Sequence, residues 1–202
     1  MTKKETPHIP KQRQTLINIF LYRNQQINLS AIRNPEEVYI KHILDSLELG
    51  KIFSLGTFHN ATLVDLWTWG GFPLLPLAIQ YPHLQCIWLD ARKKKCFAIE
   101  QIVKELWLSN VQTLRSRAEE AKLQVDILTA RAVAYADKLF QRALPLVKTW
   151  GFLVFYKLFT PEEDHDIHSL IQSHHLELQK THRYFLPDDK DKKERIIYII
   201  KK

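Results

Sequence analysis

Glycine is scarce in this chain of 202 residues, which contains only 5. At the usual frequency of about 7%, a chain of this length would contain roughly 14. Tryptophan, normally a rare residue, is present in the same number, 5. Because glycine serves the turns and helix ends that need a positive φ, the shortage directs attention to what occupies those places.

Other absences limit the class of protein. No apolar run approaches about 20 residues, so the sequence predicts no transmembrane helix. The first residues, MTKKETPHIPKQRQ, lack the apolar segment of a signal peptide. Cys86 and Cys96 have no C-x-x-C spacing, which favours reduced core thiols over a disulfide or a zinc site. We therefore expect a cytoplasmic protein.

The composition is that of a globular protein with a basic charge. Hydrophobic residues make up 46% of the chain and charged residues 25%, which suits one domain with a sizeable core. The formal net charge is +7. This balance favours a polyanionic partner such as nucleic acid, although many basic chains have none.

The first part of the chain is predicted to be helical. Residues 11–26 carry apolar side chains at helical spacing. Asn34, followed by Pro35 and two glutamates, predicts the start of a second helix that runs to about Gly50. We expect a helical segment at residues 1–58, packed on a second domain formed by residues 59–202.

Strands and helices alternate in the remainder. This alternation predicts an α/β fold with a doubly wound, mostly parallel, seven-stranded sheet, and two consecutive strands at the end predict an antiparallel edge. The expected strands are 61–66, 84–90, 110–114, 125–131, 151–157, 176–186 and 194–202, and the expected helices are 72–80, 92–106, 133–148 and 161–175.

Acidic residues end the first two strands, where such sheets bind ligands. Asp65 ends the first strand and Asp90 the second. The Asp90 carboxylate could accept hydrogen bonds from ribose hydroxyls. It could instead only cap the helix that starts at Arg92. The spacing leaves both interpretations open. The turn between them lacks the G-x-G-x-x-G of nicotinamide-binding folds, which disfavours an oxidoreductase. An acid followed by a glycine-rich turn is typical of S-adenosylmethionine sites.

Four tryptophans stand where glycine would be expected. The segment DLWTWGGFP becomes such a glycine-rich turn when Trp67 and Trp69 are read as glycines. Trp107 follows an amphipathic helix, where a left-handed glycine is the usual stop, and Trp150 precedes a strand. Trp88, inside a strand, fits either residue. We hypothesise that UGA codons meaning glycine in the source organism were translated as tryptophan. The alternative is that the tryptophans are genuine and the turn is altered.

Several motifs stand in the order of one known family. They are INLSAIRNPEEVYIKHILDSL (27–47), DLWTWGGFPLLPLAI (65–79), LDARKKKCFAIEQIVKELWLSNV (89–111), SRAEE (116–120), ILTARAVA (127–134) and VFYK (154–157). Together they resemble the glucose-inhibited-division protein B family, the bacterial 16S ribosomal RNA guanine-N7 methyltransferases. The resemblance covers about residues 15–200. Leu74 and Leu158 depart from glycines of the family pattern.

The resemblance implies a Rossmann-like class I methyltransferase fold with an N-terminal helical extension. It also implies S-adenosylmethionine as methyl donor, no metal, and 16S ribosomal RNA in the small ribosomal subunit as partner of a monomeric enzyme that is not bound to a membrane. If Trp67 and Trp69 are genuine, the alternative is a catalytically impaired protein that binds RNA or the ribosome on the same fold.

The resemblance also assigns residues to the site. Arg131 is the candidate catalytic residue. The candidate cofactor-binding residues are Asp65, Trp67, Gly71, Phe72, Asp90, Ala118, Glu119 and Arg131. Without the family, Phe72 reads as a core residue, Glu119 as a helix-start acid and Arg131 as a surface cation.

RNA contacts are expected from two groups of residues. The first group belongs to the N-terminal signature at 27–47, which also includes Asp45 and is expected to face RNA or to close over the donor. The second group consists of basic residues. The candidates are Asn28, Ser30, Arg33, His42, Arg92, Lys93, Lys94 and Lys157. Asn28 and Ser30 also suit turn or cap positions, and His42 suits a packed histidine. The D-H-D-x-H cluster at 164–168 reads as a solvated helix face rather than a metal site.

The chemistry of guanine N7 explains why no catalytic base is evident. This nitrogen carries a lone pair and no proton, so methylation requires alignment and exclusion of water rather than proton removal. The target base must also be unstacked to reach a pocket, where aromatic or guanidinium planes hold it. Phe72 and Arg131 are the candidates for that contact.

Overall fold

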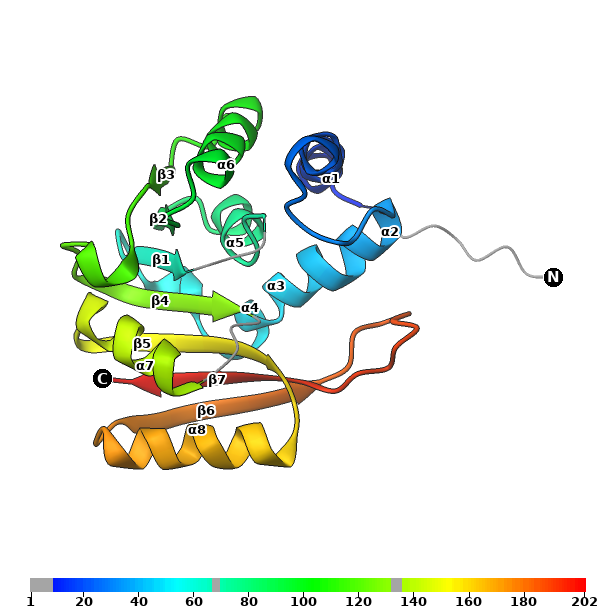
Figure 1. Ribbon diagram of the computed structural model, residues 1–202. Coiled ribbons are helices and arrows are strands. Elements are labelled where there is room, and N and C mark those ends of the chain that lie inside the picture. The colour runs from blue at the N-terminus through cyan, green and yellow to red at the C-terminus, as the bar shows by residue number, and fades with distance from the viewer. Residues whose placement is uncertain (1–8, 67–69, 132–135) are drawn as a thin grey trace.

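The computed structural model describes residues 9–66, 70–131 and 136–202. It contains one seven-stranded sheet in the order β3-β2-β1-β4-β5-β7-β6 (Figure 1). Neighbouring strands from β3 to β5 are parallel, and β7 pairs antiparallel with both β5 and β6. The strands are β1 (Thr62–Leu66), β2 (Gln85–Leu89), β3 (Val111–Leu114), β4 (Val125–Arg131), β5 (Val147–Leu158), β6 (Glu177–Tyr184) and β7 (Arg195–Lys201). The predicted α/β sheet with an antiparallel edge is confirmed.

Helices precede and connect the strands. Asn34 caps the second helical stretch as predicted, because its side chain accepts hydrogen bonds from the backbone N–H groups of Glu36 and Glu37. The first part of the chain forms α1 (Lys11–Ile27), α2 (Pro35–Val38), the π-helix η1 (Tyr39–Leu44), α3 (Asp45–Leu47), α4 (Leu49–Ile52) and η2 (Leu55–Thr57). The later helices are α5 (Leu74–Gln80), α6 (Lys93–Glu105), η3 (Ala118–Glu120), α7 (Ala136–Ala143), η4 (Leu144–Leu146) and α8 (Pro161–Ser173).

Two hydrophobic layers cover the sheet. On one face Leu63 and Ile127 belong to a buried cluster with side chains of α1, α2, α5 and α6. On the other face Val64 and Leu128 belong to a cluster with α7 and α8. Figure 1 shows α1, α5 and α6 grouped together and α7 with α8 on the opposite side. Successive strand residues thus face opposite layers, and the N-terminal helices share a core with the sheet.

One predicted helix is too long. The expected helix 133–148 ends at Ala143 within its described part, and β5 begins at Val147 rather than at residue 151. Pro145 explains the difference, because a proline lacks the N–H that helix propagation needs. The chain then pairs Val147 with Val125 of β4.

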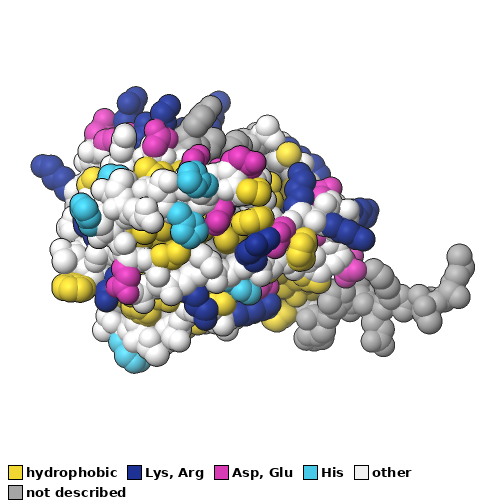
Figure 2. Space-filling view, turned by 90° about the horizontal axis from the view of Figure 1, so that it is seen from below, with side chains coloured by type: hydrophobic (Ala, Val, Ile, Leu, Met, Phe, Trp, Pro, Cys, Tyr) yellow, Lys and Arg dark blue, Asp and Glu magenta, His cyan; other side chains and the backbone are white. Residues whose placement is uncertain are grey.

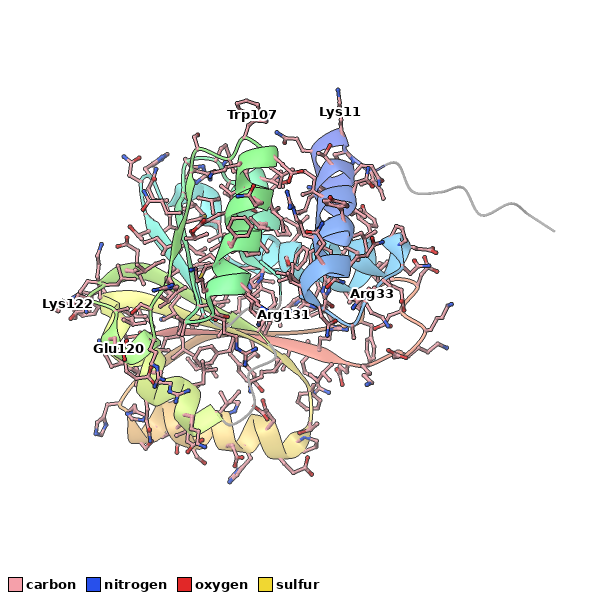
Figure 3. The ribbon with its side chains drawn as sticks, turned by 45° about the horizontal axis from the view of Figure 1, so that its top comes forward. Lys11, Arg33, Trp107, Glu120, Lys122 and Arg131 are labelled. Atoms are coloured by element: carbon pink, nitrogen blue, oxygen red, sulfur yellow. The ribbon has the colours of Figure 1, made fainter. Side chains whose placement is uncertain are left out.

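The backbone at two tryptophans is left-handed, as glycine positions would be. Trp107 has φ 55°, and Trp150 has φ 70°. At the end of α6, Trp107 N–H donates to the Lys104 carbonyl and Leu108 N–H donates to the Val103 carbonyl, which is the Schellman motif that normally carries glycine. The Trp107 side chain is 91% exposed and projects from the end of α6 (Figure 3). These positions have the predicted conformation.

The other tryptophans differ. Trp88 is fully buried in β2 and is one of the largest core side chains. It therefore has the environment of a genuine core residue. Trp67 and Trp69 lie outside the described residues.

Candidate functional site

The carboxyl ends of β1, β2 and β4 meet at one edge of the sheet. The parallel register sets Leu66 beside Leu89 on one side and beside Ala130 on the other. Asp65, Asp90 and Arg131 therefore lie at the same edge. The helices that follow β1 and β4, α5 and α7, belong to opposite layers, so this is the point where strand order reverses and where such sheets bind ligands.

The turn after β1 requires glycine at its described positions. Gly70 has φ 78° and Gly71 has φ 90°. A Cβ atom on Gly70 would lie 2.6 Å from Phe20 Cε2, and one on Gly71 would lie 2.5 Å from Leu75 Cδ1. Both glycines therefore pack against core side chains, and their positive φ is the conformation that a tight glycine turn needs. Trp67, the other predicted turn contact, is not among the described residues.

The Asp65 carboxylate is buried and oriented from the neighbouring strand. Its Oδ1 accepts a hydrogen bond of 2.6 Å from Thr129 Oγ1 of β4. Both residues have no exposed surface. A buried carboxylate at the end of β1 suits an acid that organises the first turn of a ligand site.

Asp90 makes the helix-start contact that the sequence left open. Its Oδ1 accepts 2.8 Å from Arg92 N–H, and its Oδ2 lies 3.8 Å from Lys95 Nζ. The side chain is held just beyond β2. Each carboxylate oxygen accepts two hydrogen bonds, so the capping contact leaves acceptor capacity for ribose hydroxyls. The ribose contact of Asp90 stays a prediction.

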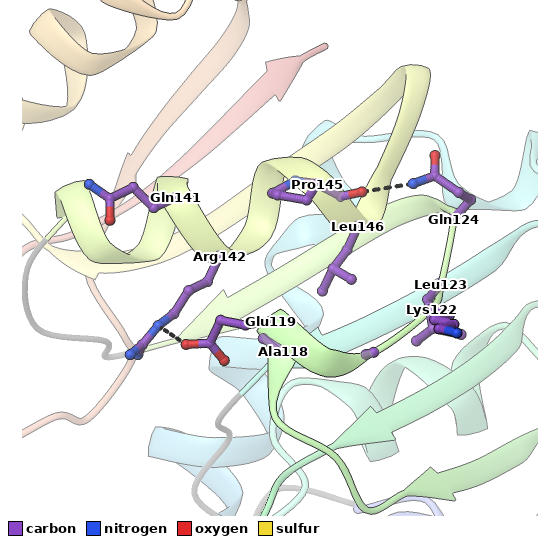
Figure 4. Close-up of a pocket in the computed structure, with 10 residues that line it drawn as sticks. Ala118, Glu119, Lys122, Leu123, Gln124, Gln141, Arg142, Pro145 and Leu146 are labelled. Carbon is purple, nitrogen blue, oxygen red and sulfur yellow. Dashed lines mark hydrogen bonds and ion pairs between the residues drawn. The ribbon is translucent and has the colours of Figure 1, made fainter.

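Ala118 and Glu119 lie in η3 beside a cavity of about 630 Å³ (Figure 4). Glu119 Oε1 is 2.5 Å from Arg142 Nε of α7. The cavity continues to Gln124 and Pro145, which precede the amino ends of β4 and β5. Only its η3 end lies toward the edge that carries Asp65 and Asp90.

Phe72 is a packing residue rather than an open stacking plane. It is 1% exposed. The His42 ring stacks on it at 4.6 Å, and the Phe20 ring meets it edge-on at 5.0 Å. The prediction that Phe72 stacks on the target base is therefore wrong in this conformation, because both neighbours occupy the space that a base would need.

Ser30 and His42 are also buried, which corrects their predicted contact with RNA. His42 Nε2 lies 3.0 Å from Ser30 Oγ, and the ring packs against Phe72. Burial and the nearby Arg131 charge hold the pKa of His42 well below its usual value, so the ring is neutral. Both residues support the Phe72 side of the turn instead of facing a polyanion.

Arg131 lies where the N-terminal helices meet the sheet (Figure 3). Its Nε is 3.0 Å from Asp45 Oδ2, and its Nη2 donates to the Lys41 backbone carbonyl. Asp45 Oδ1 accepts 2.8 Å from the Tyr184 hydroxyl and lies 3.5 Å from Arg195 Nη1. These side chains line a cavity of about 440 Å³.

The sequence did not reveal this cluster as a unit. The sequence places Asp45 only within the N-terminal signature and does not indicate that Tyr184 or Arg195 joins it. The contacts join α3, β4, β6 and β7, which are far apart in the chain. The charge types alone gave no signal, because isolated aspartate and arginine residues are mostly surface groups.

The remaining RNA candidates divide into exposed and buried residues. Arg92, Lys93 and Lys94 are exposed at the start of α6. Lys157 is buried, lines the Arg131 cavity and pairs with Glu163. It therefore does not offer the predicted surface phosphate contact. Figure 2 shows one face of the molecule, on which basic side chains are interspersed with acidic and histidine side chains.

Asn28 and Arg33 shape the loop after α1. Asn28 ends α1 with φ 52°, which is the cap interpretation that the sequence left open. Its Oδ1 accepts 2.6 Å from Arg33 Nη2, and Arg33 also donates to the Ser30 carbonyl. Both side chains remain exposed, so contacts of these two with RNA stay predictions.

Other site types find little support among the residues that the structure describes. They contain no group of three or more histidine, cysteine, aspartate or glutamate side chains that could hold a metal ion. In the 164–168 cluster, Asp164 accepts a hydrogen bond from the Tyr198 hydroxyl instead. Cys86 and Cys96 are buried free thiols, and burial raises the pKa of Cys86 to about 12. Within the described ranges, no helix has the length and apolar character to cross a membrane.

Comparison with known proteins identifies the family. The model of the family described as rRNA small subunit methyltransferase G matches residues 10–194. The chain is 34% identical over 160 residues to a ribosomal RNA small subunit methyltransferase G of Leuconostoc citreum, covering 76% of this chain and 67% of the relative. It is 32% identical over 186 residues to that of Lysinibacillus sphaericus, covering 89% and 76%.

Solved structures agree on the fold. A SAM-dependent methyltransferase from Aquifex aeolicus superimposes with a TM-score of 0.62 at 15% identity, covering 89% of this chain and 97% of that one. The alignments to three of the relatives by sequence span only 64% to 67% of their length, about two thirds. With the family model matching most of the chain, the resemblance in the motifs is confirmed: the chain belongs to the rRNA small subunit methyltransferase G family.

Proposed function

We propose that this chain transfers the methyl group of S-adenosylmethionine to N7 of a guanine in 16S ribosomal RNA of the small subunit. The observation that carries the proposal is the convergence of Gly71, Asp65, Asp90 and Arg131 at one edge of the sheet, in a chain of this family. Relatives by sequence bear the name ribosomal RNA small subunit methyltransferase G. We further propose that the protein acts as a monomer in the cytoplasm.

The donor side fits S-adenosylmethionine. The turn after β1 has a positive φ at Gly70 and Gly71, the conformation that lets a glycine turn bring its backbone close to a ligand. Asp90 would hold the ribose hydroxyls, and Ala118 and Glu119 would lie beside the adenine. When bound, the donor supplies an electrophilic methyl group. The residues of this chain bind and orient it.

The acceptor side fits a guanine that needs no deprotonation. Arg131 lines the 440 Å³ cavity, and its buried Nη1 has no hydrogen-bond partner among the described residues. Arginine is a preferred partner of guanine O6. A contact from Arg131 to O6 would orient the base and leave the N7 lone pair free. Neither a general base nor a Lewis-acid metal is required by this chemistry.

RNA binding would depend on exposed basic side chains near the end of β2. The exposed residues Arg92, Lys93 and Lys94 stand two to four residues after Asp90. Cations near the start of a helix oppose its dipole and contribute little to local stability. A phosphate-binding role explains their presence better.

The test is transfer of a radioactive methyl group to ribosomal particles. Small subunits from cells that lack this methylation are incubated with the chain as given, and with a version that carries Trp67→Gly and Trp69→Gly. We expect label in small-subunit RNA, and none in large-subunit RNA, with the glycine version. Asp90→Ala in the same background is the control for donor dependence.

The outcomes separate the two functions considered. Transfer by the glycine version alone would show that the tryptophans impair the donor turn. RNA binding by both versions with transfer by neither, although the donor binds, would contradict the enzyme proposal and favour an RNA-binding protein.

A further inference from the structure

Asp45 is a buried carboxylate that joins distant parts of the chain. It begins α3 in the N-terminal helices and is 1% exposed. Its two oxygens contact Arg131 of β4, Tyr184 of β6 and Arg195 of β7. A buried carboxylate is costly unless it is paired, so this position is built around the two guanidinium groups.

The helix before Asp45 is irregular, and the irregularity serves the same arginine. In a regular α-helix the Asp45 N–H would donate to the Lys41 carbonyl four residues earlier. Here it donates to the carbonyls of His42 and Ile40, at the end of the π-helical stretch Tyr39–Leu44. The Lys41 carbonyl accepts a hydrogen bond from Arg131 Nη2 instead. Single π-helical turns are frequent at functional sites.

The two contacts fix the arginine on two of its three nitrogens. Asp45 holds Nε, and the Lys41 carbonyl holds Nη2. The third, Nη1, is buried and has no partner within the described part of the chain. A planar guanidinium held at Nε and Nη2 has a fixed orientation, so the direction of Nη1 is determined as well.

We propose that Asp45 is a positioning residue that, with the Lys41 carbonyl, fixes the orientation of the Arg131 guanidinium beside the cavity proposed for the target base. The inference rests on the proposed function, since that function gives Arg131 its contact with the methyl acceptor. Asp45 then acts through Arg131 rather than by touching RNA. Arg195 is also paired with the buried Asp189, so Asp45 is the carboxylate that holds Arg131.

A purely structural role would give Asp45 the same burial, so the experiment must separate structural support from positioning of Arg131. Asp45→Asn keeps the shape and removes the charge that holds Arg131 Nε. Glu48→Gln is the matched control, because Glu48 is a buried carboxylate one turn further along and pairs with Lys51 and His182. All variants are made in the full chain, in the version that binds the donor.

Three measurements are made on each variant. In kinetics, Asp45→Asn should lower kcat by about tenfold or more, because small misplacements of a positioning group are costly. Donor affinity by calorimetry should stay unchanged. Combined with Arg131→Lys, Asp45→Asn should add no further loss, since both changes remove one interaction. Glu48→Gln should keep kcat, even where melting shows lost stability.

Nuclear magnetic resonance supplies a readout that needs no activity. The Arg131 Nε–H signal, assigned by its absence in Arg131→Lys, should be sharp and protected from exchange in the parent chain. It should broaden or move in Asp45→Asn and persist in Glu48→Gln. An unchanged signal in Asp45→Asn, or kinetic losses that multiply with those of Arg131→Lys, would overturn the inference. If the signals behave as expected but no variant or parent transfers methyl groups to RNA, the proposed function fails and the positioning of Arg131 stands.

Discussion

The two halves of the proposed site are held by different forces. The donor half, at the ends of β1 and β2, depends on backbone space, since side chains at Gly70 and Gly71 would overlap Phe20 and Leu75. The acceptor half, at the end of β4, depends on charge, since Asp45 joins Arg131 and Arg195. Damage to the first is therefore steric and local. Damage to the second reaches across several strands.

The largest effect is expected in the donor half. Replacing Trp67 and Trp69 by glycine should raise affinity for S-adenosylmethionine by about 100-fold or more, or about 2.7 kcal/mol, because indole side chains hinder positive φ and close approach. Calorimetry on both versions measures the difference. Equally tight binding by both would show that the turn tolerates tryptophan, and would remove the main argument for glycine at these codons.

Asp90→Ala should weaken donor binding by about 1–3 kcal/mol through loss of charge-assisted hydrogen bonds to the ribose. Asp126→Ala is a matched control at the opposite edge of the sheet, where that carboxylate accepts from Thr62 N–H and pairs with Lys148. Affinity and melting are measured on both variants. If Asp90 only starts α6, Asp90→Ala would lose about 1 kcal/mol of stability and no donor affinity.

Charge reversal at Arg92, Lys93 and Lys94 should sharpen the separation between the halves. The apparent KM for RNA should rise by about tenfold or more at physiological salt, because phosphate contacts dominate affinity for nucleic acid. Donor affinity should stay nearly intact. Titration at several salt concentrations gives the control, since the reversed variant should show a shallower salt dependence. A parent-like KM and salt slope would place the RNA contacts elsewhere.

Burial of the His42 ring makes the stability of the protein depend on pH. Its pKa is lowered in the folded chain, whereas the unfolded chain has the ordinary value of about 6.5. The unfolded state therefore takes up a proton first, and stability should fall as pH drops below about 6.5, by at most about 1.4 kcal/mol per pH unit for this group. Melting from pH 5 to 7.5 should show a smaller slope for His42→Gln. An equal slope would assign the acid sensitivity to other groups.

The smallest effect is expected far from both halves. Trp107→Gly should stabilise the chain by roughly 0.5–1 kcal/mol, because relief of the left-handed strain exceeds the entropy that glycine adds to the unfolded state. Trp107→Ala keeps a Cβ atom at positive φ and should give no comparable gain. Trp88→Gly should have the opposite sign, because it empties a buried core position. Destabilisation by Trp107→Gly would contradict the glycine interpretation of this helix end.

The sequence predicted features that are local in the chain. The Asn34 cap and the left-handed Trp107 depend on neighbours within a few residues, so periodicity and helix-end chemistry indicate them directly. The prediction of a helix beyond Ala143 is wrong, because Pro145 ends the helix although the apolar spacing favours its continuation.

Features built from distant residues were not predicted. The stacking of His42 on Phe72 buries both, and nothing in their spacing indicates which face of each ring is covered. The contacts of Asp45 with Arg131 and Arg195 exist only once β4 and β7 are placed in one sheet. The family resemblance supplied Arg131 as a candidate, but not the carboxylate that orients it.

The most direct test of the account is the position and substrate of the methyl group. The glycine version is incubated with donor and either small ribosomal subunits or free guanosine, and the RNA is mapped by cleavage at methylated guanine N7. The account predicts modification of a guanine N7 in 16S RNA and no turnover of guanosine, because the cavity must act together with the phosphate contacts of Arg92, Lys93 and Lys94. Efficient methylation of the free nucleoside, or methyl groups found only on exocyclic amines, would contradict it.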